Sequence, residues 1–391
     1  MTIMKIVMLL ICVATINLNI NSANATPITK SNEQLSRDFD SITIESKYLR
    51  EKREVWVYLP KGYAESTKDY PVIFLLDGKR HFEHAIVSQS ILQTENMMPG
   101  TIIVAVTNKS GNRRRDLVTN RVAFVNYLNE EVVSAVKKYY RTSSQLTLFG
   151  HSLAGAFATD VLLNQNTAFT NFIAASPVLQ IESMQLISRL ETYKPTIKAS
   201  LYLSMGDELA EGVSASTAFE QFLTILKEQQ THALNWHATH LAEQVHMTTP
   251  ALTLYAGLTH LFSDYQLPRY MDLSDFNHRG GMEGLTNLFK KRGEKYQISP
   301  NIPEVALRRL GFTLFDTGSQ KEGLEILLLN VEKYPDSARA INALAQVYED
   351  MKQPERAIST YKKGLNITEK GSRTHEHFVN QLKRLKTLGE S

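Results

Sequence analysis

Residues 53–241 alternate between short apolar runs and longer segments in which apolar residues recur at helical spacing. Within the short runs the apolar residues are nearly continuous, which is typical of strands that are buried on both faces. Strands that alternate with helices favour a parallel sheet, because each crossover connection holds a helix. The clearest helical patterns cover 122–140, 153–165 and 213–229. The sequence therefore predicts an α/β fold, with a mostly parallel sheet covered by helices on both faces. The strand-like runs are "REVWVYL" (53–59), "PVIFLL" (71–76), "TIIVAVT" (101–107), "QLTLFG" (145–150), "NFIAAS" (171–176), "ASLYLSM" (199–205) and the more polar "ALNWHATHL" (233–241).

After about residue 265 the strand-like runs stop, and the chain repeats itself between residues 304 and 370. Three sets of positions match at one constant offset: Leu310-Gly311 with Leu344-Ala345, Gly323 with Ala357, and Leu327 with Tyr361. This offset is the period of tetratricopeptide repeats, about 34 residues, in which helix–turn–helix units stack side by side. Because about three such units are needed for stability, the helical pattern at 374–388 is predicted to cap the stack.

Residues 1–25 have the pattern of a secretory signal peptide. Lys5 precedes the apolar run "IVMLLICVATI" (6–16), and "ANA" (23–25) has the small residues of a cleavage site. The apolar run is shorter than the roughly 20 residues that span a bilayer, so cleavage after Ala25 is expected rather than stable membrane insertion. The expected domain plan is a signal peptide (1–25), an α/β domain (26–265), a helical linker (266–300) and helical repeats with a capping helix (301–391).

The only cysteine of the chain, Cys12, lies inside this predicted signal peptide. A mature chain from Thr26 would have no thiol, which excludes cysteine nucleophiles, disulfides and thiolate metal sites. A large exported protein without disulfides fits a bacterial periplasm, so the expected location is periplasmic or secreted. The formal net charge of +3 is too small to indicate a nucleic-acid partner.

The segment "LTLFGHSLAGAF" (146–157) places Ser152 between a predicted strand and a predicted helix. In the nucleophile elbow of α/β-hydrolases, the serine lies on a strained turn that projects its hydroxyl from the sheet, and its neighbours must be small. Gly150, Ala154 and Gly155 meet this need, although alanine stands where the strict G-x-S-x-G pattern has its second glycine. A serine in an ordinary tight turn is the alternative, but the strand–turn–helix context favours a catalytic nucleophile.

A serine hydroxyl needs a base to take its proton and an acid to orient that base. In α/β-hydrolases these residues follow the serine in the order Asp or Glu, then His, on loops after later strands. Glu208 lies directly after the run at 199–205, and His246 lies in "AEQVHMTTP" (242–250), before a predicted helix. Glu208 and His246 are therefore the expected partners of Ser152. Asp207 and Glu211 remain alternatives to Glu208.

Three histidines, His237, His240 and His246, offer a zinc site as a competing interpretation. Side chains three positions apart on a strand lie on opposite faces, so His237 and His240 are better explained by packing. Neither a metal nor another cofactor is predicted.

The oxyanion that develops on an attacked ester needs backbone N–H donors. One donor is expected from Leu153, directly after the serine, and the other from the loop after "PVIFLL", at Gly78 or Lys79.

The short motifs that contain these residues, taken together and in their order along the chain, resemble those of the bacterial putative esterases. This family includes S-formylglutathione hydrolases and periplasmic ferric-enterobactin esterases. The resemblance covers roughly residues 40–265, and a subgroup with C-terminal tetratricopeptide-like repeats is similar to the whole mature chain. The subgroup's acid usually stands in a Gly-x-Glu context, which favours Glu208 over Asp207. The family often has proline where Thr119 stands and glycine where Ala154 stands. The motifs are "SKYLREKREVWVYLP" (46–60), "YPVIFLLDG" (70–78), "RRRDLVT" (113–119), "GHSLAG" (150–155), "ASPVL" (175–179), "GDE" (206–208) and "EQVHMTTPAL" (243–252).

The resemblance implies an exported serine esterase that acts on a small-molecule ester, such as a siderophore trilactone, an acylated sugar or a thioester. Arg113 and Arg115 are candidates for contact with an anionic substrate such as a ferric catecholate complex, although arginine clusters are more often solvated. A protein of another class, a non-catalytic scaffold that binds a partner through its helical repeats, is the rival interpretation. The presence of serine, acid and histidine candidates argues against it.

Overall fold

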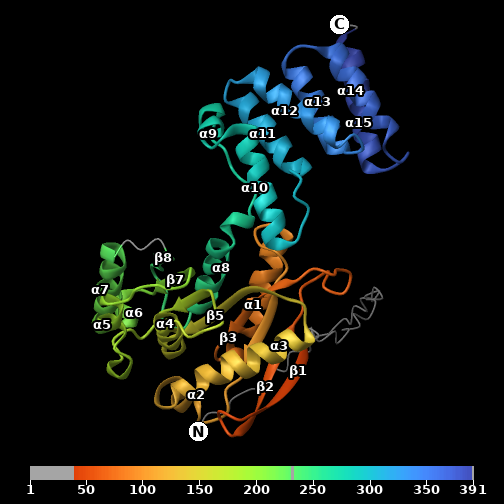
Figure 1. Ribbon diagram of the computed structural model, residues 1–391. Coiled ribbons are helices and arrows are strands. Elements are labelled where there is room, and N and C mark those ends of the chain that lie inside the picture. Colours follow the sequence, from red (N-terminus) through yellow and green to blue (C-terminus); the bar gives the residue numbers. More distant parts are fainter. Residues whose placement is uncertain (1–38, 230–232, 390–391) are drawn as a thin grey trace, which may run out of the picture. The chain divides into compact units, whose positions relative to one another are not determined.

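The computed structural model describes residues 39–229 and 233–389 (Figure 1). The expected signal peptide and its cleavage site after Ala25 lie outside the described residues. No helix within the described ranges is both long and apolar enough to span a membrane.

An eight-stranded sheet forms the first part of the described chain, with strand order β1-β2-β4-β3-β5-β6-β7-β8. The pairs β1–β2 and β2–β4 are antiparallel, and all the other neighbouring pairs are parallel. The predicted mostly parallel sheet is confirmed. Only β1 was not expected, because this edge strand alternates exposed and half-buried residues and lacks an apolar run. The strands are β1 (Asp40–Ser46), β2 (Glu51–Tyr58), β3 (Tyr70–Leu75), β4 (Ile102–Val106), β5 (Thr142–His151), β6 (Asn171–Ala175), β7 (Ala199–Met205) and β8 (Leu234–His240).

Helices cover both faces of this sheet, as the apolar runs predicted. Successive side chains of β3 divide between two cores: Val72 and Phe74 pack with α3, α4, α5 and α7, whereas Ile73 and Leu75 pack with α1 and α8. Burial on both faces explains why the central strands are apolar throughout. The helical segments are α1 (Gly78–Thr94), η1 (Arg115–Thr119), α2 (Arg121–Asn126), η2 (Tyr127–Val132), α3 (Val133–Tyr139), α4 (Leu153–Asn164), η3 (Glu182–Met184), α5 (Leu186–Glu191), α6 (Glu208–Glu211), α7 (Val213–Gln229), α8 (Thr249–Leu261) and η4 (Ser263–Tyr265).

The remainder of the described chain is helical. Helix starts recur at the offset that the sequence predicted, from Glu304 to Ala338 and from Gln320 to Pro354. A Cβ on Gly323 would lie 2.7 Å from the carbonyl oxygen of Gly311, so these glycines let α11 and α12 approach closely. The helices are α9 (Leu273–His278), α10 (Gly281–Tyr296), α11 (Glu304–Asp316), α12 (Gln320–Lys333), α13 (Ala338–Asp350), α14 (Pro354–Asn366) and α15 (Arg373–Gly389).

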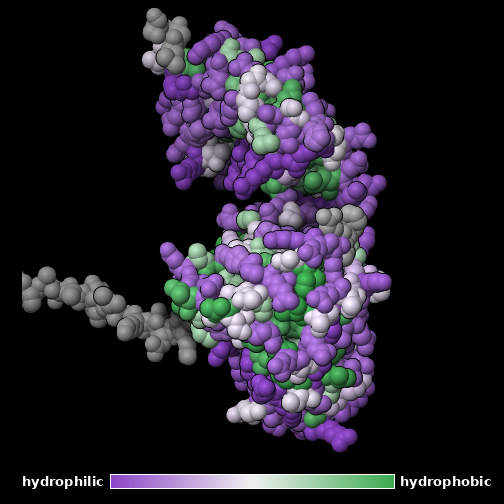
Figure 2. Space-filling view, turned by 90° about the vertical axis from the view of Figure 1, so that its left-hand side faces the viewer, coloured by the Kyte–Doolittle hydropathy of each residue, from purple (hydrophilic) through white to green (hydrophobic). Residues whose placement is uncertain are grey.

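The segment expected to be a linker, 266–300, contributes to a core of the helical part. Phe276 of α9 and Phe289 of α10 pack with Leu307 and Leu310 of α11. A second core joins α13 and α14 to α15 through Phe378. In the view of Figure 2, hydrophilic side chains cover most of the surface, with apolar residues in smaller patches between them.

Candidate active site

Ser152 lies alone between the end of β5 and the start of α4, in the turn that the sequence predicted. Its backbone has φ 60° and ψ −120°, a conformation that costs free energy for a residue with a side chain. Two hydrogen bonds hold it: Ser152 N donates to Ala175 O at 2.9 Å, and Val178 N donates to Ser152 O at 3.3 Å. This is the geometry of a nucleophile elbow.

The elbow depends on the absence of a side chain at one neighbouring position. A Cβ on Gly150 would lie 2.2 Å from the carbonyl oxygen of Ala154, far inside van der Waals contact. Ala154 itself is completely buried, so its methyl group fits where the strict pattern has glycine.

His246 lies in the loop between β8 and α8, and its ring is held by a carboxylate. Its Nδ1 lies 2.6 Å from Oε2 of Glu211, whose side chain is only 3% exposed. The other carboxylate oxygen, Oε1, accepts from Gly206 N at 3.1 Å and from Ser176 Oγ at 2.5 Å. The Glu211 carboxylate is therefore fixed from both sides and presents one oxygen to the imidazole.

The carboxylate that contacts His246 belongs to Glu211 and not to Glu208, the acid that the sequence predicted. Glu208 opens the one-turn helix α6 and is exposed, and Asp207 caps that helix by accepting from Leu209 N at 2.9 Å. Because α6 turns the chain back toward the end of β7, its last residue rather than its first reaches Gly206 and His246. The only sequence signal for this was a third acidic residue, Glu211, just before Gly212.

His151, the residue before the serine, joins the serine's strand to the histidine's loop. Its Nε2 lies 2.9 Å from the carbonyl oxygen of His246, and the two rings lie 4.6 Å apart between centroids. Burial lowers the pKa of His151 to about 4, so near neutral pH the ring is uncharged and its Nε2–H donates to that carbonyl. Sequence reasoning assigned no role to His151, since nothing in the motif indicates where its side chain points.

A cavity of about 370 Å³ opens over Ser152 and His246. Its wall is rich in cationic side chains. The residues that line it are Asp77, Lys79, Arg80, Asn108, Arg113, His151, Ser152, His246 and Met247.

Arg113 is fixed at this cavity by Asp77. Its Nε and Nη2 donate to the two carboxylate oxygens of Asp77, each at 2.7 Å, and Asn108 donates to the same carboxylate. Burial favours the neutral acid, but the hydrogen bonds and charge of Arg113 hold the pKa of Asp77 below its ordinary value. The Arg113 side chain is 39% exposed and lines the cavity.

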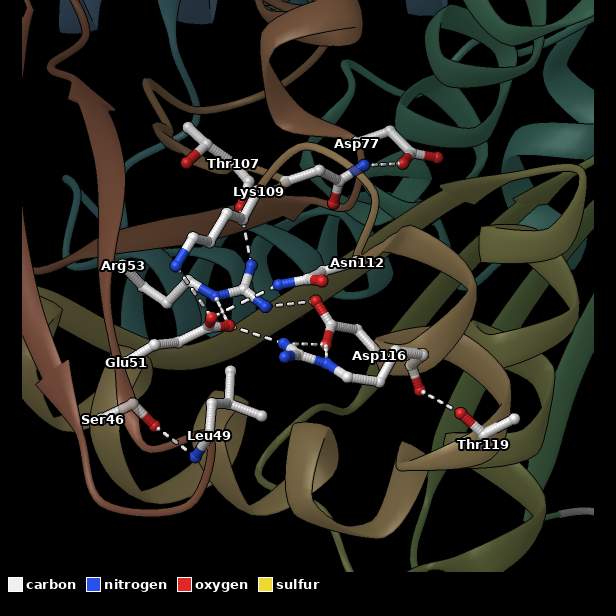
Figure 3. Close-up of polar contacts among 12 residues, drawn as sticks. Ser46, Leu49, Glu51, Arg53, Asp77, Thr107, Lys109, Asn112, Asp116 and Thr119 are labelled. Carbon is white, nitrogen blue, oxygen red and sulfur yellow. Dashed lines mark hydrogen bonds and ion pairs between the residues drawn. The ribbon is translucent and has the colours of Figure 1, made fainter.

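Arg115, the other arginine that was a candidate for substrate contact, does not line this cavity and forms ion pairs instead. Its Nη2 pairs with Glu51 at 2.5 Å and with Asp116 at 2.6 Å. Figure 3 shows that Arg53 pairs with the same two carboxylates. Burial would raise the pKa of Glu51, but Arg115, Lys109 and Arg53 together lower it to about 2. This ion-pair cluster attaches the loop that carries Arg113 to the start of β2.

The expected oxyanion donors lie at the first turns of two helices. Leu153 is the first residue of α4, and Gly78 and Lys79 are the first residues of α1. First-turn N–H groups have no partner within their own helix and can bind an anion. A Cβ on Gly78 would lie 2.6 Å from the backbone of Ala105, so the missing side chain brings this helix start against β4.

The competing zinc interpretation has no support in the geometry. The His237 ring stacks on His260 with centroids 5.0 Å apart, and His240 Nε2 pairs with Glu220 at 2.9 Å. Within the described ranges, no group of three or more histidines, cysteines or carboxylates is arranged to hold a metal ion.

The family model described as "Putative esterase" matches residues 46–249, just over half of the chain. The chain belongs to this esterase family. The family match supports a hydrolase, as the resemblance of the motifs between residues 46 and 252 implied. No curated protein matches the sequence.

Solved structures share its fold. An uncharacterised protein from Capnocytophaga ochracea aligns over 90% of this chain and all of its own, with 16% identity and a TM-score of 0.61. An IroE-like serine hydrolase from Shewanella oneidensis aligns over 76% of this chain and all of its own, with 21% identity and a TM-score of 0.59. The siderophore hydrolase EstA from Aspergillus nidulans aligns over 61% of this chain and 98% of its own, with 19% identity and a TM-score of 0.50.

Proposed function

We propose that the protein is an exported serine hydrolase that cleaves carboxylic esters through Ser152, His246 and Glu211. The observation that carries the proposal is that one cavity is lined by a serine in a strained elbow and by a histidine held by a buried carboxylate. A serine in an ordinary turn would need neither the strain nor the histidine.

The contact with Glu211 decides which nitrogen of His246 acts as the base. Nδ1 faces a carboxylate, which can only accept, so the proton of the neutral ring lies on Nδ1 and Nε2 keeps its lone pair. Nε2 takes the hydroxyl proton as Ser152 attacks the ester carbonyl, and the buried charge of Glu211 stabilises the imidazolium that forms. His246 then protonates the departing alcohol, which leaves an acyl group on Ser152. A water, deprotonated by the same nitrogen, releases the acid and restores the serine.

The tetrahedral intermediate carries its negative charge on the former carbonyl oxygen. We assign the N–H of Leu153 and that of Lys79 as its donors, since α4 begins directly after Ser152 and Lys79 lines the same cavity. Each such donor contributes about 3 kcal/mol to transition-state stabilisation in related chemistry.

The cationic cavity wall favours an ester with an anionic acyl or alcohol part. The charge of Asp77 offsets that of Arg113, and Glu54 lies 4.0 Å from Lys79 Nζ. The exposed side chain of Arg80 leaves a positive excess in the wall. A siderophore trilactone is the specific candidate, because its catecholates are anionic in the iron complex. The neighbours described as an IroE-like serine hydrolase and a siderophore hydrolase add support from fold.

Labelling of the full chain with a fluorophosphonate tests the reaction class, because the reagent bonds only to an activated serine. We expect stoichiometric labelling that is lost in Ser152→Ala and kept in Ser188→Ala, a control at an exposed serine. Hydrolysis of p-nitrophenyl acetate should fall in parallel by several orders of magnitude. Full labelling of the Ser152→Ala protein would contradict the proposal, and absence of any labelling would favour the scaffold interpretation.

Export is the remaining part of the proposal, and it rests on Lys5, the apolar run at 6–16 and the cleavage motif. Mass spectrometry of the protein from its native host should find Thr26 at the N-terminus. A soluble form that begins at Met1 would contradict export without affecting the proposed chemistry.

A further inference from the structure

Two histidines of α1 form a hydrogen-bonded pair next to the nucleophile elbow. His81 Nδ1 lies 2.9 Å from His84 Nε2, so one ring donates and the other accepts. Burial lowers the pKa of His81 to about 3 and that of His84 to about 4, so both rings are uncharged near neutral pH. Neither residue lines the cavity over Ser152, and the chemistry proposed above uses neither.

The pair leaves two buried nitrogens unpaired. His81 Nε2 and His84 Nδ1 have no hydrogen-bond partner among the residues that the structure describes. Such atoms lose their hydration without replacement, so two apolar side chains of similar size would stabilise this part of the fold more. Most buried polar atoms in folded proteins do have partners. The pair is therefore better explained by what its orientation does than by its contribution to stability.

The His81 ring packs edge-to-face against two residues of the strand that carries the serine. Its centroid lies 5.2 Å from that of Phe149 and 5.9 Å from that of His151, at interplanar angles of 78° and 81°. Phe149 and His151 are two positions apart on β5, so their side chains lie on one face of that strand. Ser152 follows directly. His81 therefore contacts the strand immediately before the nucleophile.

The helix that carries His81 also carries the proposed oxyanion donors. Gly78 and Lys79 begin α1, and His81 comes three positions after Gly78. Asp77, the residue before α1, does not cap the helix with its side chain, and its carboxylate pairs with Arg113 instead. The contact of His81 with β5 therefore helps to set the distance between these donors and the serine.

We propose that His81 is a positioning residue. Its hydrogen bond to His84 orients the ring, and the ring fixes the first turn of α1 relative to β5, which places the oxyanion donors at the ester carbonyl. Without that hydrogen bond the ring would turn about its broad χ2 torsion and lose the perpendicular contact with His151. A misplacement of about 1 Å can cost about 100-fold in rate, so even a small shift of this turn slows the chemical step. The inference rests on the proposed esterase chemistry.

The test compares p-nitrophenyl acetate hydrolysis by the full chain and by variants of the pair. His81→Phe keeps an aromatic ring and removes the hydrogen bond, so kcat should fall about tenfold while KM changes less than twofold. His84→Phe removes the same hydrogen bond and should give the same loss, whereas His84→Gln can still pair through its amide and should keep at least half of the parent kcat. The double variant His81→Phe/His84→Phe should lose no more than either single variant, since one contact is removed in all three.

A second measurement separates positioning from a general loss of structure. Phenylboronic acid forms a tetrahedral adduct with an activated serine, and one of its oxygens takes the place of the oxyanion. Its inhibition constant should rise about tenfold in His81→Phe, in proportion to the fall in kcat. Gln89→Leu is the matched control, because Gln89 is a fully buried polar residue farther along α1. This control should change the melting temperature and leave both kcat and the inhibition constant within twofold of the parent values.

Thermal melting checks that each variant is folded. If His81→Phe does not fold, His81→Asn replaces it with the same expected loss, because it keeps a partner for His84 and removes the ring. A folded His81→Phe protein with kcat within twofold of the parent value, or with a raised KM and an unchanged kcat, would overturn the proposal. Losses that multiply in the double variant would also overturn it. If the parent protein shows no turnover that depends on Ser152, the proposed function itself fails, and this inference fails with it.

Discussion

Replacing Glu211 by glutamine tests whether this residue, and not a neighbouring acidic residue, supplies the carboxylate that orients His246. In the variant, Gly206 N and Ser176 Oγ still donate, so the amide oxygen keeps the place of Oε1 and the amide nitrogen faces His246. An amide nitrogen only donates, so Nδ1 must accept and the ring proton moves to Nε2. The base would then hold the wrong tautomer, while the hydrogen bonds that position the side chain remain.

The expected loss is about 10⁴-fold in kcat, the effect of the same tautomer change in a related triad, or about 5.4 kcal/mol in activation free energy. KM should change little, because Glu211 is buried behind the imidazole and does not line the cavity over Ser152. The assay is steady-state hydrolysis of p-nitrophenyl acetate by Glu211→Gln, Glu208→Gln and the parent protein, with thermal melting as a check on folding.

Glu208→Gln is the matched control, since it makes the same chemical change on an exposed residue of the same one-turn helix. It should keep at least half of the parent kcat. A Glu211→Gln protein that melts normally and keeps more than a tenth of the parent kcat would refute this assignment. A greater loss in Glu208→Gln than in Glu211→Gln would restore Glu208 as the acid.

Three further outcomes are expected. His151→Phe removes one of two donors to the carbonyl oxygen of His246, since Thr249 Oγ1 still donates to it at 3.0 Å. The loss of one hydrogen bond costs about 0.5–1.5 kcal/mol, so kcat should fall about 2- to 10-fold and His151→Gln should recover most of it. Equal kcat in both variants would contradict this. Gly150→Ala should destabilise the protein by about 3 kcal/mol in denaturant unfolding and abolish turnover, because its Cβ would collide with Ala154; a normal melt would contradict it. The pKa of Glu51 is lowered in the folded state from about 4.5 to about 2, so its contribution to stability is present above pH 4.5 and is lost as the pH falls toward 2. Glu51→Gln should therefore be less stable than the parent at pH 7 and should lose less further stability between pH 4.5 and pH 2. Parallel curves of unfolding free energy against pH for the two proteins would refute this.

The sequence by itself determined the features that depend on neighbours along the chain. Continuous apolar runs predicted central strands buried on both faces, and the structure has them. The elbow at Ser152 followed from small residues at fixed spacing, since the tightness of a turn depends on the few residues within it. The constant offset between the helical hairpins was visible for the same reason, because each unit repeats its own local pattern.

The tertiary structure decided which side chains meet across the fold. Three acidic residues follow β7 within a short stretch, and only the path of α6 brings Glu211, and neither Asp207 nor Glu208, to His246. Arg113 and Arg115 look alike in sequence, yet Arg113 pairs with Asp77 and lines the cavity, whereas Arg115 pairs with Glu51 and Asp116 and does not. These choices depend on distances of a few ångströms between segments far apart in the chain. Hydrophobic periodicity carries no information about such distances, because it reports burial and not the identity of the neighbour.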